Sequence, residues 1–141
     1  MQTILVAVDG SEHTSKAVTM AAELAKALEA TLVLFSVDEP GPLRGALAKI
    51  AENEDLARHE IAGWILGGAE QVARRTGVAK IETVSGGGSD VARAILDAAD
   101  LHNADMIVVG ARGLNELEGL IMGSVSHKVI NLSYRPVLVV K

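Results

Sequence analysis

Glycine and serine gather in the stretch GARGLNELEGLIMGSVS, which runs from Gly110 to Ser126 between an apolar run and a segment typical of a helix. Gly110 and Gly113 allow positive φ and let a ligand come close to the backbone. Gly123 and Ser124 stand where the helix should start, and free N–H groups there attract anions with the help of the helix dipole. Because the hydroxyls of Ser124 and Ser126 add donors, the pattern predicts a phosphate site.

The charges of this stretch are less favourable to phosphate. Glu116 and Glu118 lie in it, and Arg112 is its only cation. Acidic side chains disfavour a triphosphate unless they face solvent or a divalent ion bridges them. On general grounds of loop length and helix capping, an ordinary long loop whose Ser124 merely caps the next helix is an equal alternative.

A second glycine-rich stretch, SGGGSD, covers residues 85–90. It resembles the SGGxDS phosphate loop of ATP pyrophosphatases, but its last two residues stand in the opposite order. It also follows the third predicted strand rather than the first, and short motifs need their structural context. The simpler interpretation is a strand-to-helix turn with Ser89 as N-cap, which can still border a nucleotide site.

Composition limits the class of protein. The 141 residues fit one domain, residues 1–141, and the content of 49% hydrophobic but only 2% aromatic residues predicts an aliphatic core. A net charge of −5 without a Lys/Arg cluster argues against nucleic acid and anionic membranes as partners. The chain has no cysteine, no apolar run approaching a membrane span and no visible targeting signal, so we expect a soluble cytoplasmic protein.

Five short apolar runs predict strands at residues 3–8, 31–37, 79–85, 104–110 and 135–141. Helical patterns lie between them at residues 15–28, 53–76, 90–102 and 124–133, with a shorter helical segment at 43–51. This alternation predicts an α/β fold: a single-domain, doubly wound, five-stranded parallel sheet with helices on both faces, which is Rossmann-like. Ligands of such sheets bind beyond the carboxyl ends of the strands, where the strand order reverses.

The long second helix contains residues that need explanation. Gly63, Gly67 and Gly68 lower its helix propensity, whereas Gly77 is a suitable residue to end it. Trp64 is expected in a core or an interface.

The spacing Gly110-x-x-Gly113, nine residues, Gly123-Ser124 resembles the G-2x-G-9x-G-[S/T] motif of the universal stress protein family. DMIVVGARG and GSVSHKVI…RPVLVV are similar to the final third of that family, and ILVAVDGSEHTSKAV is similar to its opening strand and helix. The likeness covers essentially the whole chain and is weakest at residues 40–77.

This resemblance implies a fold of the adenine nucleotide alpha hydrolase type. It also implies that ATP, with Mg or Mn, binds at the carboxyl ends of the strands, and that the chain forms a homodimer. Asp9 and the backbone of Val37 would contact the adenosine, since a carboxylate suits ribose hydroxyls or an adenine N–H. An Asx turn is the alternative for Asp9. The residues expected around the phosphates and ribose are Gly110, Gly113, Gly123, Ser124 and Val125.

The resemblance favours a small ATP-binding stress or signalling module with slow or no hydrolysis. A nucleotide-free interaction dimer of the same fold and an enzyme that activates a substrate with ATP are the alternatives. The sequence has no Walker A motif, nucleophile elbow or obvious acid/base pair, which disfavours the enzyme. Its apolar last strand, PVLVVK, should lie at a sheet edge and needs a cover, so we expect two copies to pair there.

Overall fold

The computed structural model describes residues 1–38, 54–112 and 122–141. Their strands are β1 (Thr3–Ala7), β2 (Thr31–Val37), β3 (Lys80–Gly86), β4 (Met106–Gly110) and β5 (Val137–Val140). Their helices are α1 (Glu12–Ala27), α3 (Glu54–Thr76), α4 (Val91–Leu101) and α5 (Ser124–Leu132). The predicted helical segment at 43–51 lies entirely outside the described residues.

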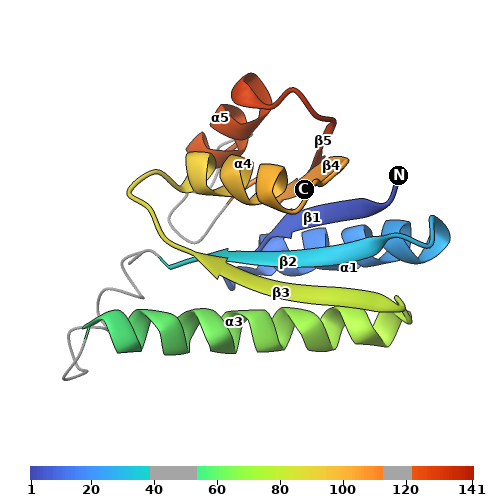
Figure 1. Cartoon of the computed structure of the whole chain (residues 1–141), viewed down its shortest axis with the longest axis horizontal. Coiled ribbons are helices and arrows are strands. Elements are labelled where there is room, and N and C mark those ends of the chain that lie inside the picture. The colour runs from blue at the N-terminus through green and yellow to red at the C-terminus, as the bar shows by residue number, and fades with distance from the viewer. Residues whose placement is uncertain (39–53, 113–121) are drawn as a thin grey trace.

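The five strands form one parallel sheet in the order β3-β2-β1-β4-β5 (Figure 1). β1 lies in the middle, with Ile4 opposite Leu32 of β2 on one side and opposite Met106 of β4 on the other. The chain therefore adds strands outward from β1 to β3, then returns and adds β4 and β5 on the other side. The strand order reverses between β1 and β4, which is where such sheets bind ligands.

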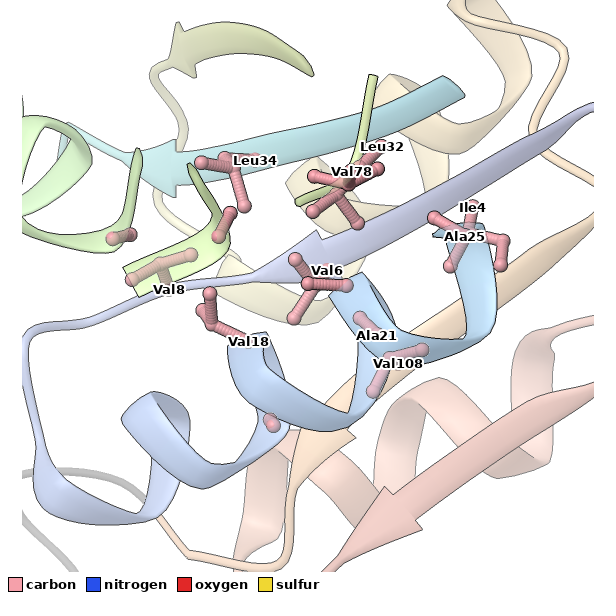
Figure 2. Close-up of a cluster of buried hydrophobic side chains, with 14 of the residues drawn as sticks. Ile4, Val6, Val8, Val18, Ala21, Ala25, Leu32, Leu34, Val78 and Val108 are labelled. Atoms are coloured by element: carbon pink, nitrogen blue, oxygen red, sulfur yellow. The ribbon is translucent and has the colours of Figure 1, made fainter. Parts of the chain in front are cut away.

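Helices cover both faces of the sheet, as predicted. On one face, Ile4, Val6 and Val108 of the sheet pack against Val18 and other residues of α1 and α3 (Figure 2). On the other face, Leu5 and further strand residues pack against α4 and α5. Successive residues of a strand point to opposite faces, so Ile4 and Leu5 belong to different cores. The doubly wound α/β fold predicted from the sequence is confirmed.

Two helix starts differ from the prediction. α1 begins at Glu12 rather than Ser15, because the side chain of Ser11 accepts a hydrogen bond from the Thr14 N–H at 3.2 Å and caps the helix. Ser89 was expected to cap α4, but this was wrong. Asp90 has the extended backbone of an N-cap, and its carboxylate accepts from the Arg93 N–H at 3.1 Å.

α3 continues through its glycines because its other face is buried, with Ile61, Leu66 and Ala73 in the core. Gly77, at φ +85°, follows its last residue, which confirms the predicted end.

Trp64 does not lie in the core, since 69% of it is exposed. None of the described helices is both long enough and apolar enough to cross a membrane.

Candidate functional site

The candidate site lies at the carboxyl edge of the sheet, where β1 and β4 diverge. β1 leads through Asp9 into α1, and β4 ends at Gly110 ahead of the segment that leads to α5. The first turn of α1 lies directly against the end of β4, because a Cβ on Gly110 would be 3.2 Å from the backbone C and O atoms of His13. The two loops that the sequence pattern singled out therefore meet at the strand reversal.

Asp9 is held in place by the start of α1. Its Oδ1 accepts hydrogen bonds from the Ser11 N–H at 2.8 Å and from the Thr14 hydroxyl at 2.9 Å. The first of these bonds is the Asx-turn geometry that the sequence left open. Thr14, which the sequence reasoning missed, is buried. The spacing D-x-S-x-x-T could have revealed it, since short polar side chains at these offsets bond one another at helix starts.

Gly110 does not have the positive φ expected of it. It is the last residue of β4 and is buried. Glycine is needed there for a different reason: a Cβ would lie 3.2 Å from the His13 backbone and 3.3 Å from the Arg112 carbonyl oxygen. The close approach predicted at this glycine is real, but the backbone of α1 makes it.

The start of α5 is fastened to the end of β4. The Ser126 hydroxyl donates to the Gly110 carbonyl oxygen at 2.6 Å, and the Gly123 N–H donates to the Ala111 carbonyl oxygen at 2.6 Å. Ser126 is only 4% exposed, and its single hydroxyl hydrogen is used in this bond. The expectation that Ser126 donates to phosphate was therefore wrong.

The N-terminus of α5 lies at the same edge and has no capping side chain. Its N-cap is Gly123, with φ −74° and ψ 164°, and no side-chain hydrogen bond caps the helix. Ser124 is the first helical residue and is exposed, so the alternative in which Ser124 caps the helix is wrong. Val125 packs against the core on the α4 and α5 side. A helix start with this kind of cap can present its first-turn N–H groups to an anion.

Val37 ends β2, beside β1, and is buried. It lies opposite Gly86, and the Asp38 N–H donates to the Gly86 carbonyl oxygen at 2.7 Å. The SGGGSD stretch thus begins within the last two residues of β3, the outer strand, and does not lie at the reversal point. A Cβ on Gly86 would lie 3.1 Å from the Phe35 ring, which gives this glycine a packing reason. This position favours the simple turn over a pyrophosphatase phosphate loop.

An ion pair joins the two helices beside the site. The Lys128 ammonium of α5 bonds the carboxylate of Asp90, the N-cap of α4. This hydrogen bond and that of the Arg93 N–H lower the pKa of Asp90 below its ordinary value.

Gly113, Glu116 and Glu118 lie outside the described residues, so the predicted site is described at Asp9, Val37, Gly110 and residues 123–125.

Comparisons with known proteins agree with this fold. The whole chain, residues 1–141, matches the sequence profile of the Universal stress protein family. Universal stress protein YxiE of Bacillus subtilis is 36% identical, over 98% of this chain and 97% of that protein.

Two solved structures carry nucleotides. A universal stress protein in complex with cAMP is 29% identical, covers 99% of this chain and 95% of its own, and superposes with a TM-score of 0.75. The universal stress protein of Archaeoglobus fulgidus in complex with dAMP is 28% identical. The match covers 100% of this chain and 98% of that one, and its TM-score is also 0.75. The sheet with its glycine-rich carboxyl edge defines a Rossmann-like α/β protein. The chain belongs to the universal stress protein family.

Proposed function

We propose that this protein binds an adenine nucleotide, ATP above all, at the carboxyl edge between β1 and β4. The observation that carries the proposal is the N-terminus of α5: a glycine caps it, and the bonds of Ser126 and Gly123 hold it against the end of β4. A helix start in this position suits a phosphate group. The relatives solved with cAMP and dAMP support an adenine nucleotide as the ligand.

In this proposal the first-turn N–H groups of α5 and the Ser124 hydroxyl bind phosphate oxygens. Asp9, which Ser11 and Thr14 orient, accepts a hydrogen bond from the ribose or the adenine amine. The backbone at Val37, at the end of the neighbouring strand, contacts the base, and Val125 closes the site beside the ribose. Gly113 belongs to the same proposed set. A Mg or Mn ion bound with ATP would neutralise part of the triphosphate charge.

We propose a regulatory ligand rather than rapid turnover. The carboxylates of Asp9 and Asp90 at this edge accept bonds that hold helix starts in place, from Ser11 and Thr14 and from Arg93 and Lys128. Binding that positions phosphates without a base or a charge clamp accelerates phosphoryl transfer little. ATP turnover far below the usual kinase range of about 1–100 per second is expected. A purified sample reaching that range would support the alternative of an ATP-dependent enzyme.

Calorimetric titration with Mg-ATP tests the site. We expect Gly123→Val to abolish measurable binding, because its side chain obstructs the helix start. Ser124→Ala should cost about 1–2 kcal/mol of binding free energy, the scale of one hydrogen bond. Leu101→Ala is the matched control, since Leu101 is 77% exposed at the far end of α4. If Gly123→Val melts like the parent and binds ATP as tightly, the phosphate site is wrong.

We also propose that two copies pair through β5, as the apolar edge of the sheet suggests. The Ile107 N–H bonds the Pro136 carbonyl and the Ala111 N–H bonds the Val140 carbonyl, so the even-numbered residues of β5 face β4. Because backbone groups alternate along a strand, Val137 and Val139 direct theirs to the outer edge. A nucleotide-free interaction dimer would use the same edge.

Val139→Pro tests this pairing, because it removes an N–H on the outer side and leaves the bonds to β4 in place. Light scattering at micromolar concentration should give a dimer for the parent and a monomer for the variant, with a similar melting temperature. A parent that is monomeric under these conditions would contradict the β5 dimer.

A further inference from the structure

The outer face of α3 has an unusual composition. Trp64, the only tryptophan of the chain, is 69% exposed there. Gly63 and Gly68 are exposed beside it, and Gly67 is half-buried. The opposite face of the same helix enters the core with Ile61, Leu66, Ala69 and other residues. α3 packs against α1, β2 and β3, and its other side points away from the sheet (Figure 1).

None of the residues that the structure describes gives these three glycines a packing reason. A Cβ on Gly63, Gly67 or Gly68 would meet nothing within 4 Å, and none of them has a positive φ. Each costs about 1 kcal/mol of helix stability relative to alanine. They leave a flat strip of backbone beside the indole, and such a strip lets another helix approach more closely than side chains would.

Two opposite charges are placed symmetrically about this strip. Glu60 and Arg75 lie at equal numbers of residues from the midpoint between Gly67 and Gly68, and both are exposed. With 3.6 residues per turn, both fall on the face that carries Trp64. Arg74 pairs with Glu70 at 2.5 Å, whereas no ion pair joins Glu60 or Arg75 to another residue of the described ranges.

We propose that α3 binds the α3 of a second copy, antiparallel about a two-fold axis at Gly67 and Gly68. This arrangement sets Glu60 of each copy opposite Arg75 of the other, twice, because a two-fold interface repeats each contact. The indole of Trp64 then covers the strip at Gly68 and Gln71 of the second copy. The charges favour the antiparallel orientation, because a parallel pair would place Glu60 against Glu60 and Arg75 against Arg75.

This surface is separate from the β5 edge. α3 packs under β2 and β3 at one side of the sheet, and β5 is the outer strand of the other side. One helix face is small beside a stable interface of about 1,200–2,000 Å² of total buried surface, so the pairing is weak. Chains that also pair through β5 would form assemblies larger than dimers as their concentration rises.

Charge reversal tests the pairing and its direction. Analytical ultracentrifugation of Val139→Pro, from about 10 μM upward, isolates the α3 contact, and the series is repeated in the parent. We expect Glu60→Arg or Arg75→Glu alone to weaken association at least tenfold, which corresponds to about 1.4 kcal/mol, since each creates two like-charge contacts. The double reversal Glu60→Arg/Arg75→Glu should restore association, with Leu101→Ala as an inert control.

Further variants separate association from folding. Gly67→Ala/Gly68→Ala should raise the melting temperature, because alanine favours helix, yet weaken association by blocking the close approach. The emission of Trp64 should shift to the blue with increasing concentration in the parent and not in Glu60→Arg. If both Val139→Pro and the parent show no concentration-dependent change in emission or mass, or if the double reversal does not restore association, the α3 pairing is wrong.

Discussion

The glycines of the carboxyl edge and those of α3 differ in how much space surrounds them. Gly110 and Gly86 are crowded, with the His13 backbone at 3.2 Å and the Phe35 ring at 3.1 Å from where a Cβ would stand. Gly10 has a φ of +85° that side chains rarely adopt. Gly63, Gly67 and Gly68 of α3 meet nothing within 4 Å. Contacts and backbone conformation among the described residues explain why glycine is needed at Gly10, Gly86 and Gly110. They do not explain the glycines of α3.

This difference changes what glycine indicates about function. At the carboxyl edge, glycine lets β4 and α1 come together, so its presence alone does not indicate a ligand. The stronger indication of a nucleotide there is the α5 start with its glycine cap at the strand reversal. On α3, by contrast, glycine weakens a helix, and no described residue packs where its Cβ would stand, which supports the proposal that a second copy covers this surface.

Gly110→Ala is the substitution with the largest expected effect. The new Cβ would lie 3.2 Å from backbone atoms of His13, a tight contact that the backbone cannot relieve by rotating away as a side chain can. We expect a loss of about 2–3 kcal/mol in the free energy of unfolding, the upper part of the overpacking range. Urea denaturation measures it. A variant as stable as the parent would mean that α1 and β4 can separate without cost. Gly110 would then be no more crowded in effect than the glycines of α3.

Ser126→Ala should come next. It deletes the donor to the Gly110 carbonyl and leaves that buried oxygen without this partner. The expected loss is about 1–3 kcal/mol of unfolding free energy. The control is Ser124→Ala, which lies in the same helix turn but is exposed and should change stability less. Equal losses for the two variants would show that the Ser126 bond does not fasten α5 to β4.

Gly10→Ala tests the conformational reason at the edge. At φ +85° the alanine is strained by about 1–2 kcal/mol, while the Ile65 side chain, 3.2 Å away, can move aside. Thermal unfolding should show a correspondingly lower melting temperature. No decrease would indicate that the loop adopts another backbone conformation at little cost.

Gly63→Ala should have the opposite sign. Open space surrounds the position, so the variant gains helix propensity of up to about 1 kcal/mol and melts at a higher temperature. Gly63 stands beside the proposed two-fold centre rather than at it, which makes it a milder change than Gly67→Ala/Gly68→Ala. If Gly63→Ala were less stable than the parent, Gly63 would be required by the fold, as the glycines of the carboxyl edge are.

The smallest effect concerns pH at the edge, where Asp90 joins α4 to α5. Its pKa is lowered in the folded state by the Lys128 hydrogen bond, so the unfolded chain takes up a proton first as pH falls. The stabilising contribution is therefore present above the ordinary value of 3.8 and is lost below it. Melting curves at pH 7 and pH 3 should differ less for Asp90→Asn than for the parent. An unchanged difference would mean that this carboxylate adds nothing.

Much of the fold follows from local patterns. Short apolar runs alternating with amphipathic segments predict a parallel sheet covered by helices, because period and composition are encoded over neighbouring residues. The same holds for the spacing of Gly110, Gly113, Gly123 and Ser124, which indicated both the family and the candidate loop. The end of α3 at Gly77 was predictable too, since a positive φ there is a local requirement.

Other features depended on residues that only the tertiary structure brings together. Gly110 is needed because of His13, and Ser126 is occupied because of Gly110, yet each pair is far apart in the chain. Asp90 and Ser89 are both acceptable caps by residue type, and the turn after β3 decided between them. Trp64 was expected in a core or an interface, and the structure rules out the core, because Trp64 lies on the side of α3 that faces away from the sheet. The sequence alone therefore determined the elements and the family, whereas long-range packing decided what each glycine, serine and tryptophan does.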